Sequence, residues 1–335
     1  TARDHAVHHA ASGQSAGYGD LVDAASDLPQ PENAEFKSRE DYKYIGQPMD
    51  TIDGMAFTTG GAIYGTDMVL PEMLYATIER SPALGGSIAS LDEAVAREVA
   101  GVVDVLRMPE PTSPPVFNIL GGVAVLATNS WAADRGRKAL EIEWDLGPNA
   151  VYSSDTYKEQ LIASASAPGN AVLSRGDADT AAASVHEAIY YAPHLSQAPM
   201  EPPAATARVN ADGTCEVWAC TQNPQAARST VADTLGLEEE QVTVNVTMLG
   251  CGFGRKSKPD FIAEAAWLAR ETGRPVKVQW TREDDIRQGY FHSVSAQYFR
   301  AGQDEEGTTT SWLHRTSFPS IVSTFAPNIA GPQPN

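Results

Sequence analysis

Hydrophobic and polar positions follow short, regular patterns from about residue 44 onward, and these patterns predict both strands and helices. Up to residue 146, alternating or continuous apolar runs predict strands at 73–79, 102–108, 123–127 and 141–144. Two short helices are expected between them. One opens with the Ser-x-x-Glu capping box at Ser90 and ends near residue 98, and the other is capped by Ser130 and ends near residue 140.

A second patterned region begins at residue 150. Strands at 204–209 and 215–220 flank Asn-Ala-Asp-Gly, a hairpin turn sequence. Helices are expected at 224–235, after an Asn-Pro start, and at 260–271, capped by Asp260 and stopped by Gly273. Further strands are predicted at 242–248 and 276–281, with a last hairpin at 293–300 and 308–316. This order of hairpins and helices favours α+β layers over a doubly wound parallel sheet.

Breaks in these patterns predict the domain organisation. Residues 1–43 are polar and irregular, so we interpret them as an extended arm or the tail of a missing upstream segment, with simple terminal disorder as the alternative. Gly-Pro-Asn at 147–149 is a linker signal. We therefore expect one domain at 44–146 and another at 150–335.

Composition narrows the possible functions. The 335 residues carry a formal net charge of −19, which argues against binding to nucleic acid or to anionic lipid. No apolar run approaches the ~18 residues that a membrane span requires. Cys215, Cys220 and Cys251 are too few for a disulfide framework and lack the spacing of a cluster or zinc site. The chain starts at Thr1 without a signal peptide, so we expect a processed chain or a fragment.

The strongest chemical signal is Gly-Cys-Gly-Phe-Gly at 250–254, between a predicted strand and helix. Glycines such as Gly250, Gly252 and Gly254 allow close approach of a ligand and positive φ, and their amides can face an anion. Arg255 and Lys256 follow directly, and together these features predict a cradle for an anionic cofactor. The pattern is not a dinucleotide-binding fingerprint, and a plain tight turn remains the alternative.

Gln222 is the second candidate, because it ends a strand and directly precedes a capped helix. Its amide can donate and accept toward a ligand, although it could equally serve only the helix cap. Glu201 in Met-Glu-Pro-Pro could lie near a site or fix a turn. The acids at 283–285 are typical of a solvated helix start, and the histidines show no zinc spacing. Motifs for a serine nucleophile elbow and for a Walker A loop are absent.

Taken together, the motifs resemble the molybdenum-binding subunit of molybdenum hydroxylases, in particular the isoquinoline 1-oxidoreductase beta-subunit type within the xanthine oxidase and aldehyde oxidase superfamily. They are Ala-Cys-Thr-Gln-Asn-Pro-Gln at 219–225, Leu-Gly-Cys-Gly-Phe-Gly-Arg at 249–255 and Val-Gln-Trp-Thr-Arg-Glu-Asp-Asp at 278–285. Upstream motifs at 62–67, 70–76, 121–125 and 141–145 match the family's hammerhead-like α/β domain. The resemblance covers about residues 10–320 and implies that a molybdopterin-binding domain, incomplete at its C-terminus, follows the hammerhead-like domain.

The resemblance also implies a cofactor and partners. The cofactor is molybdopterin with molybdenum, as the cytosine dinucleotide form in bacteria, and the pterin rather than the protein holds the metal. Gln222 would hydrogen-bond an oxygen ligand of molybdenum, and Gly250, Gly252, Phe253, Gly254 and Arg255 would contact the cofactor. Members oxidise small aldehydes or N-heteroaromatic compounds with water as the oxygen source. Electrons pass to [2Fe-2S] clusters on an iron–sulfur subunit and, in some complexes, to a cytochrome c.

Three departures qualify what the resemblance implies. The family's loop carries glycine where Cys251 stands, and Ser257 stands near where purine-specific members carry a glutamate, so we do not expect purine hydroxylation. The general-base glutamate of a Gly-x-Gly-Glu segment has no counterpart in this sequence. We therefore expect the chain to be inactive alone and to need the remaining part of the molybdenum-binding subunit. The alternative is a scaffold module that binds no cofactor. Relatives imply a periplasmic or membrane-associated complex, with the cytoplasm as the alternative.

Overall fold

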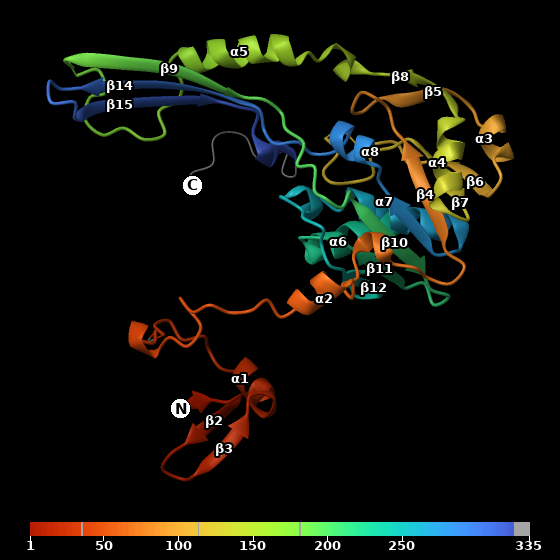
Figure 1. Cartoon of the computed structure of the whole chain (residues 1–335), viewed down its shortest axis with the longest axis horizontal. Helices are drawn as coiled ribbons and strands as arrows, with labels where there is room; N and C mark the ends of the chain where they lie inside the picture. The colour runs from red at the N-terminus through yellow and green to blue at the C-terminus, as the bar shows by residue number, and fades with distance from the viewer. Residues whose placement is uncertain (35, 113, 181, 325–335) are drawn as a thin grey trace. The chain divides into compact units, whose positions relative to one another are not determined.

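The structure is a computed structural model that describes residues 1–34, 36–112, 114–180 and 182–324 (Figure 1). The chain divides into two compact units, Thr1–Thr58 and Thr59–Asn335. No described helix combines the length and the apolar character that crossing a lipid bilayer demands.

The smaller unit, Thr1–Thr58, contains a three-stranded antiparallel sheet of very short strands. Its elements are β1 (Ala2–Arg3), β2 (Ala6–His9), β3 (Gln14–Gly17), η1 (Gly19–Leu21), α1 (Val22–Ser26) and η2 (Arg39–Asp41), with α2 (Gly54–Thr59) at its end. None of its described residues is buried, so the unit has no hydrophobic core. The sequence predicts an irregular arm. The short strands correct that prediction, and the missing core reflects the polar composition behind it.

A seven-stranded mixed sheet organises the larger unit, in the order β12-β11-β10-β13-β4-β7-β6. The pairs β11–β12 and β13–β4 are parallel, and the other neighbours are antiparallel. The strands are β4 (Leu74–Glu79), β6 (Val102–Arg107), β7 (Val123–Ala127), β10 (Ala204–Val209), β11 (Cys215–Ala219), β12 (Val242–Val246) and β13 (Val276–Gln279).

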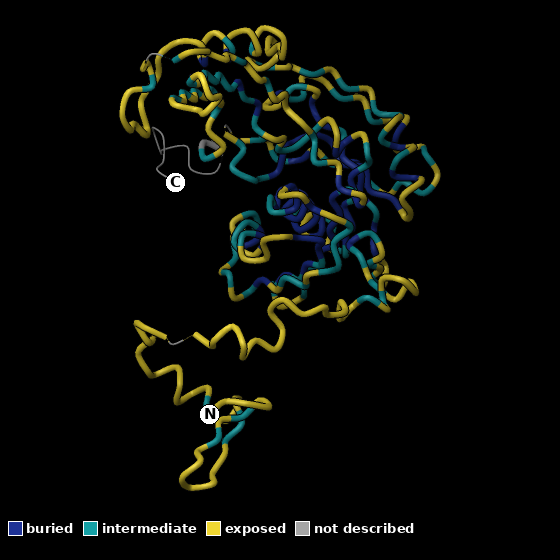
Figure 2. Tube along the Cα trace, turned by 60° about the vertical axis from the view of Figure 1, so that its left-hand side comes forward, coloured by how far each residue is buried: buried dark blue, intermediate teal, exposed yellow. Residues whose placement is uncertain are grey.

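Helices cover the two faces of this sheet unequally. On one face, α6 (Pro224–Leu235) and α7 (Asp260–Thr272) enclose the main core, in which Phe261, Leu268 and Trp280 are almost completely buried. On the other face, α3 (Ala94–Glu98) and α4 (Ser130–Lys138) cover the end of the sheet formed by β4, β7 and β6. Along β7, Ala124 and Leu126 face the main core whereas Val125 faces the small one, which is the alternation expected of a strand between two layers. Figure 2 shows the buried residues concentrated in this unit.

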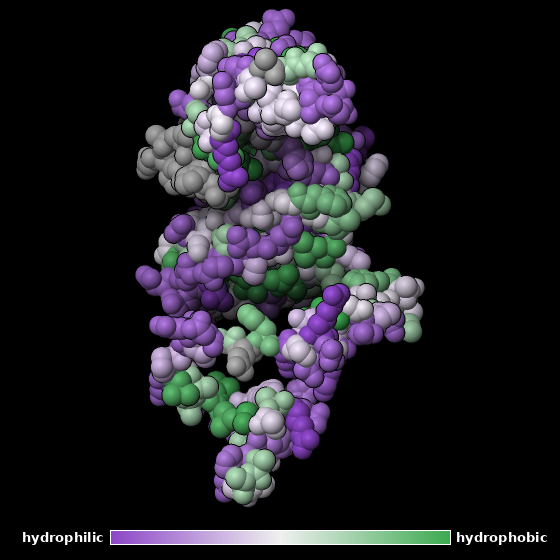
Figure 3. Space-filling model, turned by 90° about the vertical axis from the view of Figure 1, so that its left-hand side faces the viewer, coloured by the Kyte–Doolittle hydropathy of each residue, from purple (hydrophilic) through white to green (hydrophobic). Residues whose placement is uncertain are grey.

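Two smaller sheets complete the larger unit (Figure 1). The antiparallel sheet β15-β14-β9 packs against α5 through a small cluster that includes Leu161 and Ala296. Large apolar side chains such as Tyr190 and Trp312 remain exposed on this sheet, and Figure 3 shows apolar patches interspersed with hydrophilic surface. The remaining elements are β5 (Ser87–Asp92) paired with β8 (Glu141–Asp145), α5 (Ser154–Ser166), β9 (Ser184–Ala192), β14 (Ser295–Gln303), β15 (Thr309–Ser317), α8 (Arg282–Arg287), η3 (Gly65–Asp67), η4 (Pro148–Val151), η5 (Glu239–Gln241), η6 (Arg255–Ser257) and η7 (Ile321–Thr324).

The mixed α+β class is confirmed, and most predicted strands and helices are present to within two residues. Asn223 caps α6 as predicted, whereas three other predicted helix starts are wrong. Asn129 rather than Ser130 caps α4, Pro259 rather than Asp260 stands at the cap of α7, and Ser90 lies inside β5. The sequence patterns do not predict α5 or β9. In α5 only Leu161 and Ala165 are buried, which leaves no clear helical stripe to recognise.

The structure also differs from the predicted separation at residues 147–149. Strands from the 44–146 region and from the 150–335 region share the seven-stranded sheet, because β4 pairs with β13. The predicted linker residues Pro148 and Asn149 begin the helical turn η4. Local patterns predict the strands but not which distant strand each one joins.

Candidate functional site

The candidate site lies at the edge of the seven-stranded sheet where β11 and β12 end. These strands are parallel neighbours, so the segments that follow them leave the sheet at the same edge. The segment after β11 carries Gln222, and the segment after β12 carries residues 250–254, here named the glycine loop. The backbone N–H of Gly254 donates to Oε1 of Gln222 at 3.0 Å. The structure therefore brings together two motifs that the sequence singles out separately.

Gln222 is held by its backbone and presents its side chain outward. Its backbone N–H donates to the carbonyl oxygen of Lys256 at 3.0 Å, and the Thr221 hydroxyl donates to the same oxygen at 3.1 Å. The cap of α6 is made by the Asn223 side chain, so the Gln222 side chain takes no part in it. Because Oε1 of Gln222 accepts from the glycine loop, Nε2 remains as a donor. Nε2 has no hydrogen-bond partner among the described residues, and Gln222 is exposed.

The glycine loop is tightly wound under Gln222. The φ angles of Cys251, Phe253 and Gly254 are 70°, 51° and 85°, all in the left-handed region. A Cβ atom on Gly252 would lie 2.4 Å from Oε1 of Gln222, so this position has no room for a side chain. A Cβ on Gly254 would meet no atom within 4 Å, which leaves open space there. The loop therefore has no space for a side chain at Gly252, whereas Gly254 borders open space.

Arg255 and Lys256 do not face the glycine loop, which corrects the expectation that their charges line the cradle. The side chain of Arg255 is 1% exposed and donates to both oxygens of Asp260 at 2.8 Å. Burial lowers the pKa of the Arg255 guanidinium, but Asp260 outweighs it and the pKa lies above its ordinary value. The Lys256 side chain is fully buried and pairs with Glu201 at 2.7 Å. Both cations therefore form buried ion pairs beneath the loop and do not face a ligand there.

Glu201, which the sequence leaves between a site and a turn, lies directly below the glycine loop. Its Oε2 accepts from the backbone N–H of Gly250 at 3.0 Å, and its Oε1 accepts from that of Thr66 at 3.1 Å. Its position before two prolines indicates only a turn. Its partner Lys256 is 55 residues away, so no local signal could have identified this contact.

A strained segment that the sequence patterns do not reveal adjoins the same buried layer. Val116 and Phe117 have φ angles of 39° and 67°, which side-chain-bearing residues rarely adopt. The Phe117 N–H donates to the Tyr290 hydroxyl at 2.9 Å, and their rings meet edge to face with centroids 5.2 Å apart. The Lys258 ammonium lies 4.9 Å from the Phe117 ring centre. Since Tyr290 also lies 5.7 Å from the Arg255 guanidinium, strain of the kind found at functional sites occurs close to the loop.

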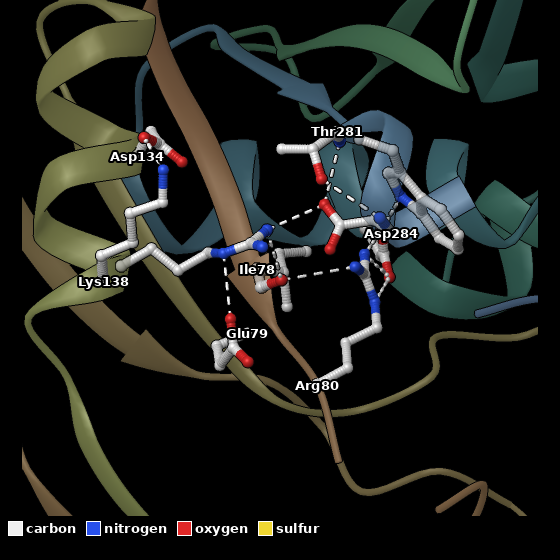
Figure 4. Close-up of polar contacts among 10 residues, drawn as sticks. Ile78, Glu79, Arg80, Asp134, Lys138, Thr281 and Asp284 are labelled. Atoms are coloured by element: carbon white, nitrogen blue, oxygen red, sulfur yellow. Dashed lines mark hydrogen bonds and ion pairs between the residues drawn. The ribbon is translucent and has the colours of Figure 1, made fainter. Parts of the chain in front are cut away.

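Of the acids at the start of α8, Glu283 is exposed as predicted, whereas Asp284 and Asp285 are buried, which corrects the prediction for these two. Asp284 pairs with Arg137 at 2.8 Å, and Asp285 pairs with Arg282 at 2.7 Å. Burial raises the pKa of Asp284, yet hydrogen bonding to Arg137 outweighs it and holds the pKa below its ordinary value. Asp284 also accepts the backbone N–H of Thr281 at 2.9 Å, and Figure 4 shows these two residues facing each other. This cluster is structural.

The other candidates form no second site. His194 and His314 lie within hydrogen-bond distance of a carbonyl oxygen and of Gln297, at 3.0 Å and 2.7 Å. In the described part of the chain, no group of three or more His, Cys, Asp or Glu residues is placed to hold a metal ion. The cysteines are free: Cys215 and Cys220 are buried and Cys251 is exposed.

Comparisons with known proteins place this geometry in a family. Residues 163–318 match the molybdopterin cofactor-binding domain. The chain is 31% identical over 282 residues to the beta subunit of isoquinoline 1-oxidoreductase from Brevundimonas diminuta, covering 78% of this chain and 34% of that protein. It is 27% identical over 332 residues to a subunit of nicotinate dehydrogenase from Pseudomonas putida, covering 93% and 26%. The structure of quinoline 2-oxidoreductase from Pseudomonas putida 86 superposes with a TM-score of 0.63 at 21% identity, over 79% of this chain and 38% of that one.

The matched region contains Glu201, Gln222 and the whole glycine loop, so the candidate site lies inside a molybdopterin cofactor-binding domain. The chain contains the molybdopterin cofactor-binding domain of a molybdenum hydroxylase large subunit of the xanthine oxidase family, as its motifs predict. It spans about a third of the length of the first of these relatives and about a quarter of the second, 34% and 26%.

The residues present fit such a cofactor. Gly252 has no Cβ, so the Gln222 side chain can lie directly against the loop, and Nε2 of Gln222 is a donor without a partner among the described residues. A neutral amide and backbone N–H groups suit the oxygen atoms of a ligand, and no protein ligand to the metal is needed when the pterin holds it.

Proposed function

We propose that this chain is part of a molybdenum hydroxylase that oxidises an N-heteroaromatic compound or an aldehyde, with water as the source of oxygen. The observation that carries the proposal is the contact between Gln222 and the glycine loop, which leaves the amide Nε2 as an exposed donor beside Gly252. Isoquinoline, nicotinate and quinoline appear in the names of the three compared proteins.

In this proposal the residues of this chain bind and orient the cofactor. When bound, the molybdenum cofactor supplies the two-electron oxidation of the substrate and the transfer of an oxygen atom derived from water. Gln222 donates from Nε2 to an oxygen atom of the cofactor, and the strand before it and the capped helix after it fix its position. Gly252 allows close approach of the cofactor, and Phe253, which is 61% exposed, supplies an apolar contact beside it.

The remaining functions are assigned to other polypeptide. The sequence contains no Gly-x-Gly-Glu segment, so we propose that the general base is a glutamate outside this sequence and that the chain alone does not turn over. Residues 44–146 would correspond to the hammerhead-like domain of the family. Electrons would leave through [2Fe-2S] clusters on an iron–sulfur subunit and reach a cytochrome c in a complex of that type. We propose a periplasmic or membrane-associated location, with the cytoplasm as the alternative.

The test begins with metal analysis of the native complex. The proposal expects about one molybdenum per chain, a pterin released on oxidation and iron from the partner. A complex purified without molybdenum or pterin would favour the alternative of a scaffold that binds no cofactor. A complex that is active without iron would contradict the proposed path of the electrons.

Two variants then test the placement of the cofactor. Gln222→Ala removes one hydrogen bond to a charged or charge-developing oxygen, worth roughly 1.5–3 kcal/mol, so turnover should fall about tenfold to a hundredfold while most molybdenum remains bound. Gly252→Val adds a Cβ where Oε1 of Gln222 lies 2.4 Å away, so molybdenum content itself should fall. The matched controls are Gln225→Ala, another exposed glutamine three residues on, and Gly169→Val, where a Cβ meets nothing within 4 Å. Full turnover in the first variant or full loading in the second would place the cofactor elsewhere.

A further inference from the structure

Glu201 contacts the first residue of the glycine loop and a residue just beyond its end. At the start of the loop, Gly250 is held on both sides: its N–H donates to Oε2 of Glu201 at 3.0 Å, and its carbonyl accepts the backbone N–H of Glu201 at 2.9 Å. Just past the end of the loop, the Lys256 ammonium donates to the same Oε2 at 2.7 Å. Oε1 accepts from Thr66, so the carboxylate itself is fixed from a third direction.

We propose that Glu201 is a positioning residue that sets the conformation of the glycine loop and, through it, the place of Gln222. The inference rests on the proposed function, because positioning matters only if the loop holds a cofactor. Glu201 acts through Lys256, whose carbonyl oxygen accepts the backbone N–H of Gln222. One carboxylate thus reaches the beginning of the loop, a residue just beyond its end and, through that residue, the backbone of the exposed amide donor.

The loop needs such a clamp because its own conformation is unfavourable. Cys251 and Phe253 carry side chains yet lie in the left-handed region, with φ angles of 70° and 51°. Both are exposed, so little packing compensates for this strain. The carboxylate of Glu201 holds Gly250 at the start of the loop and Lys256 two residues after its end, and Gln222 accepts from Gly254 at the end itself.

Burial and charge make this contact specific to a carboxylate. Glu201 is 8% exposed and the Lys256 side chain is fully buried. Among the described residues, Glu201 is the one carboxylate within ion-pair distance of Lys256. A neutral amide at position 201 would leave a buried ammonium without an ionic partner, and its NH₂ group could not accept from whichever backbone N–H it faced, that of Gly250 or that of Thr66.

The test is hydrogen exchange in the full chain, measured by mass spectrometry on peptides that span residues 247–256. In Glu201→Gln, exchange of the loop amides should accelerate by at least about tenfold, because a hydrogen bond to a charged acceptor exceeds the equivalent of one decade. The matched control is Asp284→Asn. Asp284 is also 8% exposed, pairs with Arg137 at 2.8 Å and accepts the backbone N–H of Thr281, but it contacts no residue of the loop (Figure 4). Its loop peptides should exchange as in the wild type.

A second variant keeps the test decisive if Glu201→Gln fails to fold. Gly250→Ala retains every charge but would place a Cβ 2.5 Å from that of Glu201, which forces the loop start away from the carboxylate. It should accelerate exchange in the same peptides and lower molybdenum content in the assembled complex. Unchanged loop exchange in this variant would overturn the inference. Equal acceleration in Asp284→Asn would also overturn it, since that result reports general destabilisation.

The same measurements separate this inference from the proposed function. If the wild-type complex contains no molybdenum, the proposed function fails whatever the exchange shows. If the wild type is loaded and the loop of Gly250→Ala loosens without loss of metal, the positioning role fails while the proposed function stands. Loosening of the loop together with loss of metal, in a complex whose wild type is loaded, supports both.

Discussion

The glycine loop and the layer beneath it are opposite in character. Above lies an exposed rim, defined here as Gln222 and residues 251–254, with Gly252 buried at its centre and no formal charge on any side chain. Below lies a layer of buried charges, defined as Glu201, Lys256, Arg255 and Asp260, joined in two ion pairs of 2.7 and 2.8 Å. Arg255, Lys256 and Asp260 follow the rim closely in the chain, whereas Glu201 comes from a distant segment.

The difference shows how this acidic chain can offer hydrogen-bond donors to an oxygen-rich ligand. The two cations next to the loop, Arg255 and Lys256, are buried in ion pairs inside the protein. The rim therefore offers an amide and backbone N–H groups in place of formal charge. Hydrogen bonds of this kind select by direction and distance, whereas a buried ion pair mainly holds a backbone in place. Recognition and rigidity are thus divided between two adjoining layers, and each can be disturbed separately.

The largest effect is expected in the buried layer. Asp260→Asn would leave the fully buried guanidinium of Arg255 without its bidentate partner, and breaking a buried ion pair in this way costs about 3–5 kcal/mol. Urea unfolding of the chain, followed by circular dichroism, measures the loss. Glu240→Gln, an exposed acid, is the control and should stay within about 0.5 kcal/mol of the wild type. A loss below about 1 kcal/mol for Asp260→Asn would mean that this layer does not hold the loop.

Thiol chemistry distinguishes the exposed rim from the main hydrophobic core, which contains Cys215 and Cys220, without mutation. Burial raises the pKa of Cys220 from 9.0 to about 11 and that of Cys215 to about 12, so the reactive thiolate of Cys220 is reduced about a hundredfold at pH 8. Cys251 is exposed on the rim. A disulfide reagent should therefore titrate one thiol rapidly in the native chain and three in denaturant. Equal rates for two or more thiols in the native chain would contradict the described burial.

The same shifts define a pH dependence. A pKa raised on folding contributes stability that is fully present below the unfolded value, near pH 9, and is lost as the pH rises through the folded values. The urea midpoint should therefore fall progressively above pH 9, and Cys220→Ser should fall less steeply. A midpoint that stays constant up to pH 11 would contradict the shifts.

The exposed rim was the predictable part of the site, and the buried layer was not. Gln222 and the glycine loop each follow a strand in the sequence. Glycine residues and an amide side chain can be recognised as candidate binding groups from the local sequence alone. That Arg255 points inward depends on Asp260, whose place in the sequence indicates only a helix cap. Glu201 and Lys256 meet only because distant strands bring them together, a contact that no spacing rule encodes.

The fold divides in the same way. Strands such as β7 and helices such as α6 were predicted closely from alternation and from the Asn-Pro start. The pairing of β4 with β13 was not, because it joins segments about 200 residues apart. Caps were misplaced where two capping residues adjoin, as with Asn129 and Ser130, since either side chain can accept the same N–H groups.

A smaller effect is expected for the open end of the loop. Gly254→Ala meets no atom within 4 Å, so its cost is conformational and not steric. Alanine at a φ of 85° is disfavoured by about 1–2 kcal/mol, partly offset because alanine restricts the unfolded chain, for a net loss of about 1 kcal/mol. Urea unfolding measures it, with Ala226→Gly in α6 as a helix control of similar size. A loss above about 3 kcal/mol would indicate a contact that the described geometry lacks.

The smallest expected effect has the opposite sign and concerns Cys251, where the family's loop carries glycine. Cys251 has a φ of 70°, and glycine there would relieve about 1–2 kcal/mol of left-handed strain. Glycine also gives the unfolded chain more freedom, which costs about 0.5–1 kcal/mol, so Cys251→Gly should stabilise the chain by about 0.5 kcal/mol. Cys251→Ser, which keeps a side chain at the same φ, is the control and should show no gain. If both substitutions destabilise the chain equally, the thiol makes a contact that its exposed position does not explain, and the rim would depend on more than hydrogen-bond donors.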